Sequence, residues 1–224
     1  MTKICISGSK GRIGLRLIAL AKDDPSLQVT GEFDIGQDAE PLIEQCDCLI
    51  EFTSPQATME HLALCEKHKK PMVIGTTGLS EEERSAVKNA SANIPVVFSP
   101  NMSVGVNLLF KVVRDAAKVL GPEYNVEIVE AHHVNKKDAP SGTAKELSGI
   151  VKGERGDIKI PIDSVREEDI VGEHTITFDS PVDTIEFTHS AKTRDIFVKG
   201  ALQAAKFIVT KKSGLFTMKD VLGL

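Results

Sequence analysis

The 224-residue sequence lacks tryptophan and has a single tyrosine, so it offers few flat side chains on which nucleic-acid bases stack. It also lacks a basic excess, because 27 Lys and Arg face 32 Asp and Glu, for a formal net charge of -5 at pH 7. Such a chain has no positive field with which to displace the counterions of DNA. We therefore expect no nucleic-acid partner.

Long hydrophobic runs are equally scarce. No stretch reaches the roughly 18 consecutive apolar residues of a membrane span, and Met1-Thr2-Lys3 leads directly into a short strand pattern rather than a signal-peptide core. The few cysteines lie in apolar contexts and form no Cys-x-x-Cys pair; they are Cys5, Cys46, Cys48 and Cys65. These absences predict a cytoplasmic protein with reduced core cysteines and no membrane partner.

The first hundred residues alternate short β-branched runs with amphipathic stretches, a pattern typical of βαβ units in a parallel sheet. Nearly continuous apolar runs, as expected of strands covered on both faces, predict strands at residues 3–7, 27–33, 48–52, 71–74 and 95–98. Helical spacing of apolar residues predicts a helix over 12–21, and an acidic start predicts one over 80–89.

After residue 98 the pattern changes. Ser103 precedes a long apolar stripe that ends at Gly121, which predicts a helix. A strand at 126–131, a helix from about Thr143, an antiparallel ribbon of 171–178 and 184–190, and a last helix over 195–210 follow. The predicted fold is α/β: a Rossmann-like parallel-sheet domain (1–102 and 195–224) that binds a dinucleotide, plus an α+β domain with a mixed sheet (103–194) for substrate binding and oligomerisation.

Three glycines, Gly8, Gly11 and Gly14, lie between the first predicted strand and helix. Their G-x-x-G-x-x-G spacing allows a tight turn, close approach of backbone N–H groups to a pyrophosphate, and close packing of helix on strand. A purely structural role is the alternative, and the strand-turn-helix context favours the nucleotide. The predicted cofactor-binding residues here are Gly8, Ser9, Lys10, Gly11, Arg12 and Ile13.

Asp34 follows the second predicted strand, where an acidic side chain accepts the ribose hydroxyls of an adenine nucleotide. The alternative is a solvated loop carboxylate. Asp34 would repel a 2′-phosphate, and the next residue, Ile35, has no charge to pair with one. We therefore expect NADH to be favoured, with NADPH still possible because Lys10 and Arg12 offset part of the repulsion.

A basic loop follows residue 130. His132, His133, Lys136 and Lys137 fall within six residues of an acidic protein, which indicates an anion pocket. Gly142 and Thr143 open the next predicted helix, whose first N–H groups can hold a carboxylate. Thr143 with Glu146 also fits a capping box.

The two adjacent histidines make a poor zinc site, because neighbouring strand residues point in opposite directions and no third ligand lies nearby. We expect no metal. Another interpretation suits these side chains better than a zinc site. One histidine acts as an acid near neutral pH, while the other histidine and a lysine bind an anion. For the lysines a solvated loop face is the alternative; the spacing favours function for Lys136 and solvation for Lys137.

These motifs resemble those of the 4-hydroxy-tetrahydrodipicolinate reductase family, also called dihydrodipicolinate reductase, of lysine and diaminopimelate synthesis. The strongest match is Glu130-Ala131-His132-His133 with Lys136 and Asp138-Ala139-Pro140-Ser141-Gly142-Thr143-Ala144. Further matches lie in residues 8–14, 52–55, 75–78, 101–107, 170–175 and 213–216, so that the resemblance covers essentially the whole chain. The chain is compact for this family, with short segments between Asp34 and Cys48 and between Val151 and Asp169.

The resemblance implies that His132 is the general acid and Lys136 a second proton donor and anion stabiliser. It implies that His133, Gly142 and Thr143 bind a small dicarboxylate substrate. It also implies a homotetramer, and a nicotinamide bordered by Gly75, Thr76, Thr77, Ser99, Pro100, Asn101 and Met102, residues that follow sheet strands. In the family reaction, the cyclic hydroxy-imine loses water and the conjugated ring receives a hydride.

Two other functions remain open at this point. A dehydrogenase of another amino-dicarboxylate, such as aspartate, would also need a glycine turn and an anion pocket, although the His-His-x-x-Lys and Pro-Ser-Gly-Thr combination disfavours it. A protein that senses NADH without catalysis is compatible with a Rossmann-like fold, because fold alone does not imply chemistry. The presence of His132 and Lys136 argues against it.

Overall fold

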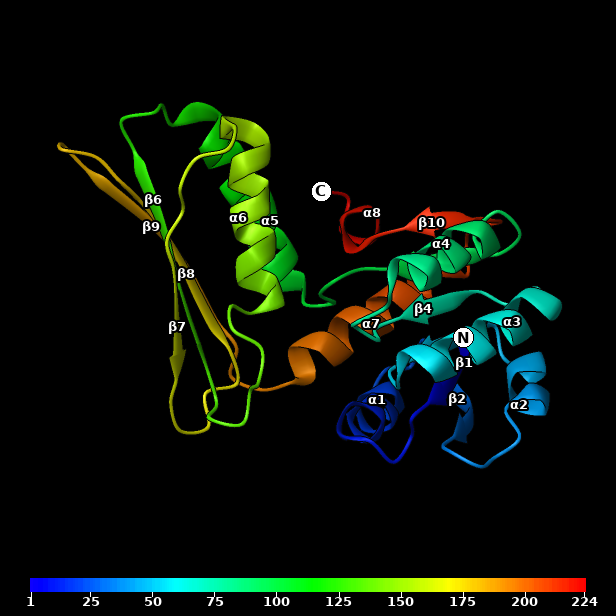
Figure 1. Cartoon of the computed structure of the whole chain (residues 1–224). Coiled ribbons are helices and arrows are strands. Elements are labelled where there is room, and N and C mark those ends of the chain that lie inside the picture. The colour runs from blue at the N-terminus through cyan, green and yellow to red at the C-terminus, as the bar shows by residue number, and fades with distance from the viewer. The chain divides into compact units, whose positions relative to one another are not determined.

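The computed structural model describes all 224 residues, which form two compact units (Figure 1). The first unit comprises Met1–Val104 and Asp195–Leu224, and the second comprises Gly105–Arg194. Each unit has its own sheet and its own hydrophobic core. None of the helices is both long and apolar enough to cross a membrane.

The first unit is built on a six-stranded sheet in the order β10-β5-β4-β3-β1-β2, and every neighbouring pair is parallel. The strands are β1 (Thr2–Ser7), β2 (Leu27–Phe33), β3 (Cys48–Glu51), β4 (Met72–Ile74), β5 (Pro95–Phe98) and β10 (Gly214–Phe216). The chain passes from β1 to β2 on one side and then returns to β3 on the other. In such sheets, ligands bind at the carboxyl ends of the strands that flank this change of direction.

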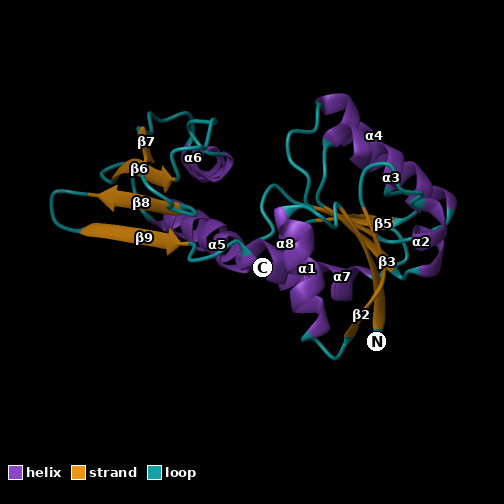
Figure 2. Ribbon diagram, turned by 90° about the horizontal axis from the view of Figure 1, so that it is seen from below, coloured by secondary structure: helices purple, strands orange, loops and turns teal.

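Helices cover both faces of this sheet (Figure 2). On one face lie α1 (Arg12–Lys22), α7 (Asp195–Ile208) and α8 (Met218–Leu222), and on the other lie α2 (Glu40–Gln45), α3 (Pro55–Lys67) and α4 (Glu81–Ala90). Buried apolar side chains fill both layers, as an all-parallel sheet requires. The four cysteines are free and buried, as predicted.

The second unit has a four-stranded mixed sheet in the order β7-β6-β8-β9. Its strands are β6 (Asn125–His132), β7 (Ile162–Arg166), β8 (Glu173–Asp179) and β9 (Thr184–Ser190). β6 pairs parallel with β7 and antiparallel with β8, which pairs antiparallel with β9. Figure 1 shows α5 (Val104–Val119) and α6 (Gly142–Arg155) on one face of this sheet, and their apolar residues share one core with it.

The predicted fold class, a Rossmann-like parallel sheet plus a second α+β part with a mixed sheet, is confirmed. The sequence reading missed five elements: α2, α3, β7, β10 and α8. The two segments that make the chain compact still contain α2 and β7. The long helix ends at Val119, two residues before Gly121, and Gly121 does not adopt the left-handed conformation of a glycine cap.

Candidate active site

The glycine turn after β1 has the close geometry that its spacing predicts. Gly8 has a φ of 69°, and its carbonyl accepts the Gly11 N–H at 2.9 Å. A Cβ atom on Gly14 would lie 2.1 Å from the Gly8 oxygen, so no other residue fits there without moving the backbone. Helix α1 therefore packs directly on the turn.

The start of α1 is open to an anion. Its N-cap, Gly11, has no side chain to satisfy the first N–H groups, and the first turn contains no acidic residue. Arg12 is exposed and Ile13 packs against the core, while Ser9 is buried and donates its N–H to the Phe33 carbonyl at 3.1 Å. Free N–H groups and the positive end of the helix dipole are what a phosphate group prefers.

Asp34 lies directly after β2 and points at the glycine turn. Its two carboxylate oxygens accept the Lys10 N–H at 2.9 Å and the Ile35 N–H at 2.8 Å. The hydrogen bond from Lys10, followed by that from Ile35, lowers the pKa of Asp34, so the group is ionised. The Asp34 carboxylate is thus fixed by two backbone hydrogen bonds and links the end of β2 to the glycine turn, rather than being freely solvated.

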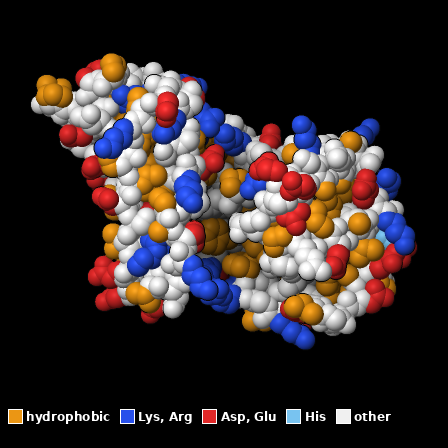
Figure 3. Space-filling model, in the orientation of Figure 1, with side chains coloured by type: hydrophobic (Ala, Val, Ile, Leu, Met, Phe, Trp, Pro, Cys, Tyr) orange, Lys and Arg blue, Asp and Glu red, His pale blue; other side chains and the backbone are white.

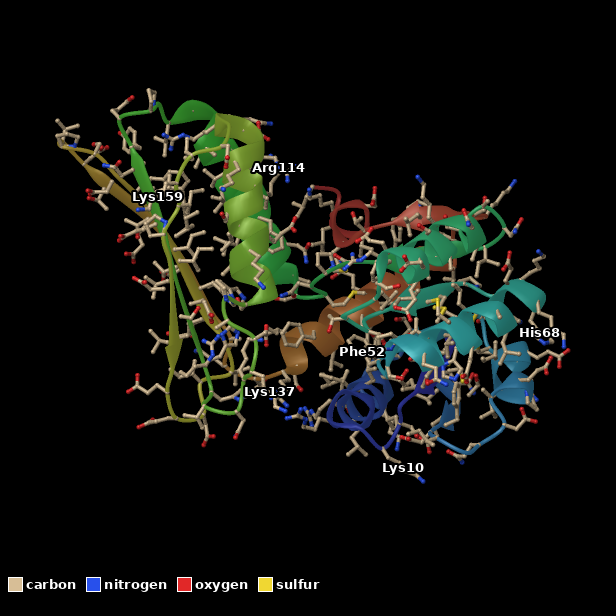
Figure 4. All side chains as sticks on the ribbon, in the orientation of Figure 1. Lys10, Phe52, His68, Arg114, Lys137 and Lys159 are labelled. Atoms are coloured by element: carbon tan, nitrogen blue, oxygen red, sulfur yellow. The ribbon has the colours of Figure 1, made fainter.

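A pocket of about 710 Å³ opens between this turn and α3. It brings together four predicted residues, Gly8, Lys10, Gly11 and Asp34. Figure 4 labels two residues that line it, Lys10 on the loop after β1 and Phe52 after β3. The remaining lining residues are Ser7, Phe33, Ile35, Gly36, Gln37, Thr53, Ser54, Gln56, Ala57, Glu60 and His61.

One hydrogen-bonded pair that includes a pocket-lining residue, His61, was not predicted from the sequence. Glu51, at the end of β3, is fully buried, and its Oε2 lies 2.6 Å from Nδ1 of His61 on α3. The Thr53 hydroxyl donates to the other oxygen of Glu51, and the Ser7 hydroxyl lies 3.4 Å from the same His61 nitrogen. His61 Nε2 has no protein partner and belongs to a pocket-lining residue. Sequence spacing gave no sign of the pair, because ten residues separate its members along the chain.

The other predicted cofactor residues lie outside the lining of this pocket. Gly75 follows β4, and a Cβ atom there would lie 2.1 Å from the Phe52 ring. Thr76 is buried and accepts the Thr53 N–H at 3.0 Å, whereas Thr77 is exposed. The second group follows β5: Ser99 is buried, Pro100 is exposed, and Asn101 accepts the Ser103 N–H at 2.8 Å through its side chain. The Met102 side chain is packed in the core and is not available to a ligand.

In the second unit, Glu130 and His132 occupy alternate positions of β6 and therefore point to the same, buried face. His132 Nδ1 lies 2.5 Å from Glu130 Oε2. Glu130 also receives two hydrogen bonds from the Arg166 guanidinium, at 2.7 and 3.0 Å, and one from the Ser141 N–H at 3.2 Å. The carboxylate is fully buried, and these donors replace the water that it loses.

The same contacts set the protonation of both groups. Burial alone would raise the pKa of Glu130, but hydrogen bonds from Arg166, Ser164 and His132 outweigh it and lower the pKa to about 2. Burial lowers the pKa of His132, and the opposing attraction of Glu130 does not restore it. The pKa of His132 therefore lies below the ordinary histidine value, and the imidazole is predominantly neutral at pH 7.

The basic loop after β6 contains the second predicted proton donor. Lys136 Nζ lies 2.7 and 2.8 Å from the two oxygens of Asp138, an ion pair that the sequence analysis did not foresee. Lys137 is exposed and has no ion-pair partner. Figure 4 labels Lys137 on this loop, and Figure 3 shows basic side chains gathered around the same place.

The start of α6 differs from the predicted cap. Ser141 is the N-cap, and its Oγ accepts the Ala144 N–H at 3.2 Å, so the capping box of Thr143 with Glu146 is wrong. Gly142 and Thr143 are the first two helical residues, as expected. The N–H of Gly142 comes too early in the helix to have a carbonyl partner one turn back.

His133 lies just beyond the end of β6 and is half-buried. Its N–H donates to the Ile170 carbonyl at 2.7 Å, and its Nε2 lies 3.5 Å from an Arg194 nitrogen. The buried face of β6 thus receives His132 but not His133, as alternation along a strand requires. No group of three or more His, Cys, Asp or Glu side chains has the arrangement of a metal site.

Comparisons with known proteins identify the family of this chain. The family model for the N-terminus of dihydrodipicolinate reductase matches residues 2–102, and that for its C-terminus matches residues 105–222. The 4-hydroxy-tetrahydrodipicolinate reductases of Geotalea uraniireducens and Geobacter sulfurreducens are 41% and 40% identical, over all of this chain and all of theirs. The Geotalea alignment spans 266 positions against 224 residues here, so at least 42 positions have no residue in this chain.

Solved structures show the same fold. A dipicolinate-bound dihydrodipicolinate reductase from Paenisporosarcina sp. has a TM-score of 0.85 at 24% identity, over 97% of each chain. An aspartate dehydrogenase from Thermotoga maritima has a TM-score of 0.52 at 16% identity, over 92% of this chain and 96% of that one. At these identities the likeness concerns the fold alone. On the two family models and the full-length identity, this chain belongs to the dihydrodipicolinate reductase family.

Proposed function

We propose that this protein reduces 4-hydroxy-tetrahydrodipicolinate to tetrahydrodipicolinate with a nicotinamide cofactor, in lysine and diaminopimelate synthesis. The reaction consumes NAD(P)H and a proton and releases water and NAD(P)⁺. The observation that carries the proposal is the cluster of Arg166, Glu130 and His132 beside the start of α6, in a chain of this family. The cluster offers a proton donor and an anion site, which a dicarboxylate substrate needs.

The glycine turn fits a dinucleotide. The uncapped start of α1 suits the pyrophosphate, and Gly14 leaves no room for a side chain that would push α1 from the turn. Asp34 suits the ribose hydroxyls, since each of its oxygens keeps a lone pair beyond its backbone hydrogen bond. The bound nicotinamide supplies a hydride. We assign dinucleotide binding to the unit that contains this turn, with Gly75–Thr77 and the backbone of 99–102 bordering the nicotinamide ring.

NADH is the preferred cofactor in this proposal. An ionised Asp34 repels a 2′-phosphate, and Ile35, which is 97% exposed, offers nothing to bind one. Lys10 and Arg12 are both exposed near the turn, so NADPH also binds, with lower affinity.

The substrate binds to the second unit. One carboxylate accepts N–H groups of Gly142 and Thr143 at the start of α6, and His133 and Lys136 add positive or hydrogen-bonding groups. After hydride transfer, the negative charge on the ring is protonated, and His132 is the donor. The donor is the imidazolium: Glu130 accepts its Nδ1–H, and the Nε2–H is the proton that passes to the ring. Lys136, although paired with Asp138, retains a third N–H with which to stabilise the charge.

The uncovered face of the second unit's sheet supports assembly of copies of this chain, as a tetramer by family resemblance. Val129 and Val165 are exposed on β6 and β7, at 37% and 39% of their surface, and Thr175 and Thr188 pair across β8 and β9 beside them. Exposed β-branched side chains on an uncovered sheet face suit an interface between copies. Sedimentation at micromolar concentration tests this, and a monomer would contradict it. We place the enzyme in the cytoplasm, where its cofactor is found.

Aspartate dehydrogenase activity is the second candidate, because the fold is shared with such an enzyme. The direct experiment follows NADH absorbance with freshly generated 4-hydroxy-tetrahydrodipicolinate, with NADPH in parallel. Oxaloacetate with ammonia, the reverse reaction of aspartate dehydrogenase, serves as the competing substrate. We expect rapid oxidation with the first substrate and none with the second. If the protein binds NADH but oxidises it with neither substrate, that result would support the alternative of a protein that senses NADH without catalysis.

A further inference from the structure

A second buried histidine lies behind His132 and has no part in the chemistry described above. His174, on β8, faces Glu130 across the antiparallel ladder and is only 5% exposed. Its ring meets the His132 ring edge to face, with centroids 5.1 Å apart. A polar side chain is costly to bury unless it is hydrogen-bonded. The hydrogen-bond partner of His174 therefore indicates the role of this buried histidine.

That partner is the N-cap of α6. His174 Nε2 lies 2.9 Å from the Ser141 hydroxyl. Ser141 holds the first turn of α6 through Ala144 and donates its own N–H to Glu130. Ser141 therefore connects three things: the start of α6, the buried carboxylate that binds His132, and the ring of His174.

We propose that His174 is a positioning residue for the reaction. Its hydrogen bond to Ser141 fixes the start of α6, where Gly142 and Thr143 bind the substrate carboxylate, and its ring fixes the plane of the His132 imidazole. The two contacts act on different steps: the first on substrate binding and the second on proton transfer. This inference rests on the proposed function of the site.

The environment of His174 also sets its tautomer. Its Nδ1 is buried without a hydrogen-bond partner. A proton on Nδ1 would be an orphaned buried donor, which proteins avoid, so the proton resides on Nε2 and His174 donates to the Ser141 oxygen. Burial lowers the pKa of His174 to about 4, so the ring stays neutral near pH 7 and places no second positive charge against His132.

Two substitutions separate the contacts. His174→Phe keeps a ring against His132 but loses the hydrogen bond, and His174→Gln keeps an N–H for Ser141 but loses the ring. We expect His174→Phe to raise KM for the substrate roughly 3- to 10-fold, the worth of one neutral hydrogen bond, with little change in kcat. We expect His174→Gln to keep KM within about 2-fold and to lower kcat several-fold.

Ser141→Ala removes the same hydrogen bond from the other side. It should raise KM like His174→Phe, and the double variant should be no worse than either single one, because both changes break one interaction. His189→Phe is the matched control. His189 lies directly opposite His174 on β9 but makes no contact with Ser141, so its variant should keep the wild-type KM.

Dipicolinate, the ligand bound to the Paenisporosarcina enzyme, gives a readout that does not need turnover. Its Kd, measured by calorimetry, should rise in His174→Phe and Ser141→Ala and stay near the wild-type value in His174→Gln. The inference is overturned if folded His174→Phe or Ser141→Ala binds dipicolinate as the wild type does. It is also overturned if the Phe and Gln variants change kcat and KM together. Wild-type protein that binds dipicolinate but reduces no substrate would instead contradict the proposed function.

Discussion

Glu130 and His132 are two positions apart in a strand, so their side chains lie on one face, and the carboxylate is 2.5 Å from the imidazole. Arg166 then pairs with that carboxylate through two hydrogen bonds, so the attraction of Glu130 for a protonated His132 is partly cancelled. Burial prevails, and the pKa of His132 is lowered. The imidazolium is consequently a stronger acid than usual, although it is present only at lower pH.

This balance predicts the pH dependence of the reaction. In the wild type, kcat/KM should be highest at low pH and should fall as pH rises through a pKa below 6.5, because His132 must be protonated to donate. Arg166→Gln leaves the charge of Glu130 less compensated, so the fall should move to higher pH. Arg155→Gln, an arginine variant elsewhere in the same unit, should keep the wild-type profile. A wild-type pKa above 6.5, or a profile that Arg166→Gln does not move, would contradict the assignment.

Asp34 sets the cofactor preference through its charge. Asp34→Asn keeps an acceptor for the Lys10 N–H but removes the negative charge, so the ratio of the NADPH Kd to the NADH Kd should fall about 10-fold. Asp38→Asn, which changes a nearby exposed loop carboxylate outside the pocket lining, is the control. Titration of both cofactors by fluorescence measures the ratio. An unmoved ratio in Asp34→Asn would mean that Asp34 does not contact the ribose.

At the scale of elements, the strands and helices predicted from the sequence are those with a clear pattern of apolar residues. The strands β2 and β5 have the predicted bounds. The strand β7 was missed because only Ile162 and Val165 among its five residues are apolar, as suits an edge strand. The helix α3 has a weak apolar face, and its signal was the N-cap Ser54 followed by Pro55. His61 and the Arg166 contact to Glu130 depend on tertiary packing, which no local pattern contains.

The junction of β1 and α1 gives a test at this scale. Gly14→Ala places a methyl group 2.1 Å from the Gly8 oxygen, so α1 must shift from the turn. We expect a loss of roughly 2–4 kcal/mol in the free energy of unfolding and weaker NADH binding. Gly149→Ala in α6 meets nothing within 4 Å and should instead stabilise the protein, by up to about 1 kcal/mol. Chemical denaturation measures both, and a neutral Gly14→Ala would show that the turn is not tightly packed.

At the scale of the whole molecule, stability depends on pH through three histidines of the second unit whose pKa values are lowered by burial. Burial lowers the pKa of His174 to about 4, and burial also lowers the pKa values of His132 and His189. Groups with depressed pKa values stabilise the folded state fully above their unfolded-state pKa and lose that contribution as pH falls through the folded-state value. For histidine this window begins near pH 6.5, above that of the carboxylates.

We therefore expect the free energy of unfolding to fall as pH decreases from about 6.5 to 4, with His174 contributing roughly 3 kcal/mol of the change. In His174→Phe the dependence on pH should be shallower by about that amount, whatever the stability of the variant at pH 7. Urea denaturation at several pH values measures the slope. Parallel curves for wild type and variant would show that His174 is not held neutral by the fold.

The most direct test of the account compares turnover with cofactor binding in His132→Gln. General acid catalysis contributes roughly 10²- to 10⁴-fold, so kcat should fall by about that factor while the Kd for NADH stays near the wild-type value. Lys136→Ala should also lower kcat, whereas His133→Ala should act mainly on KM. A near-normal kcat in His132→Gln, or a loss of NADH binding in the same variant, would contradict the assignment of His132 as the proton donor.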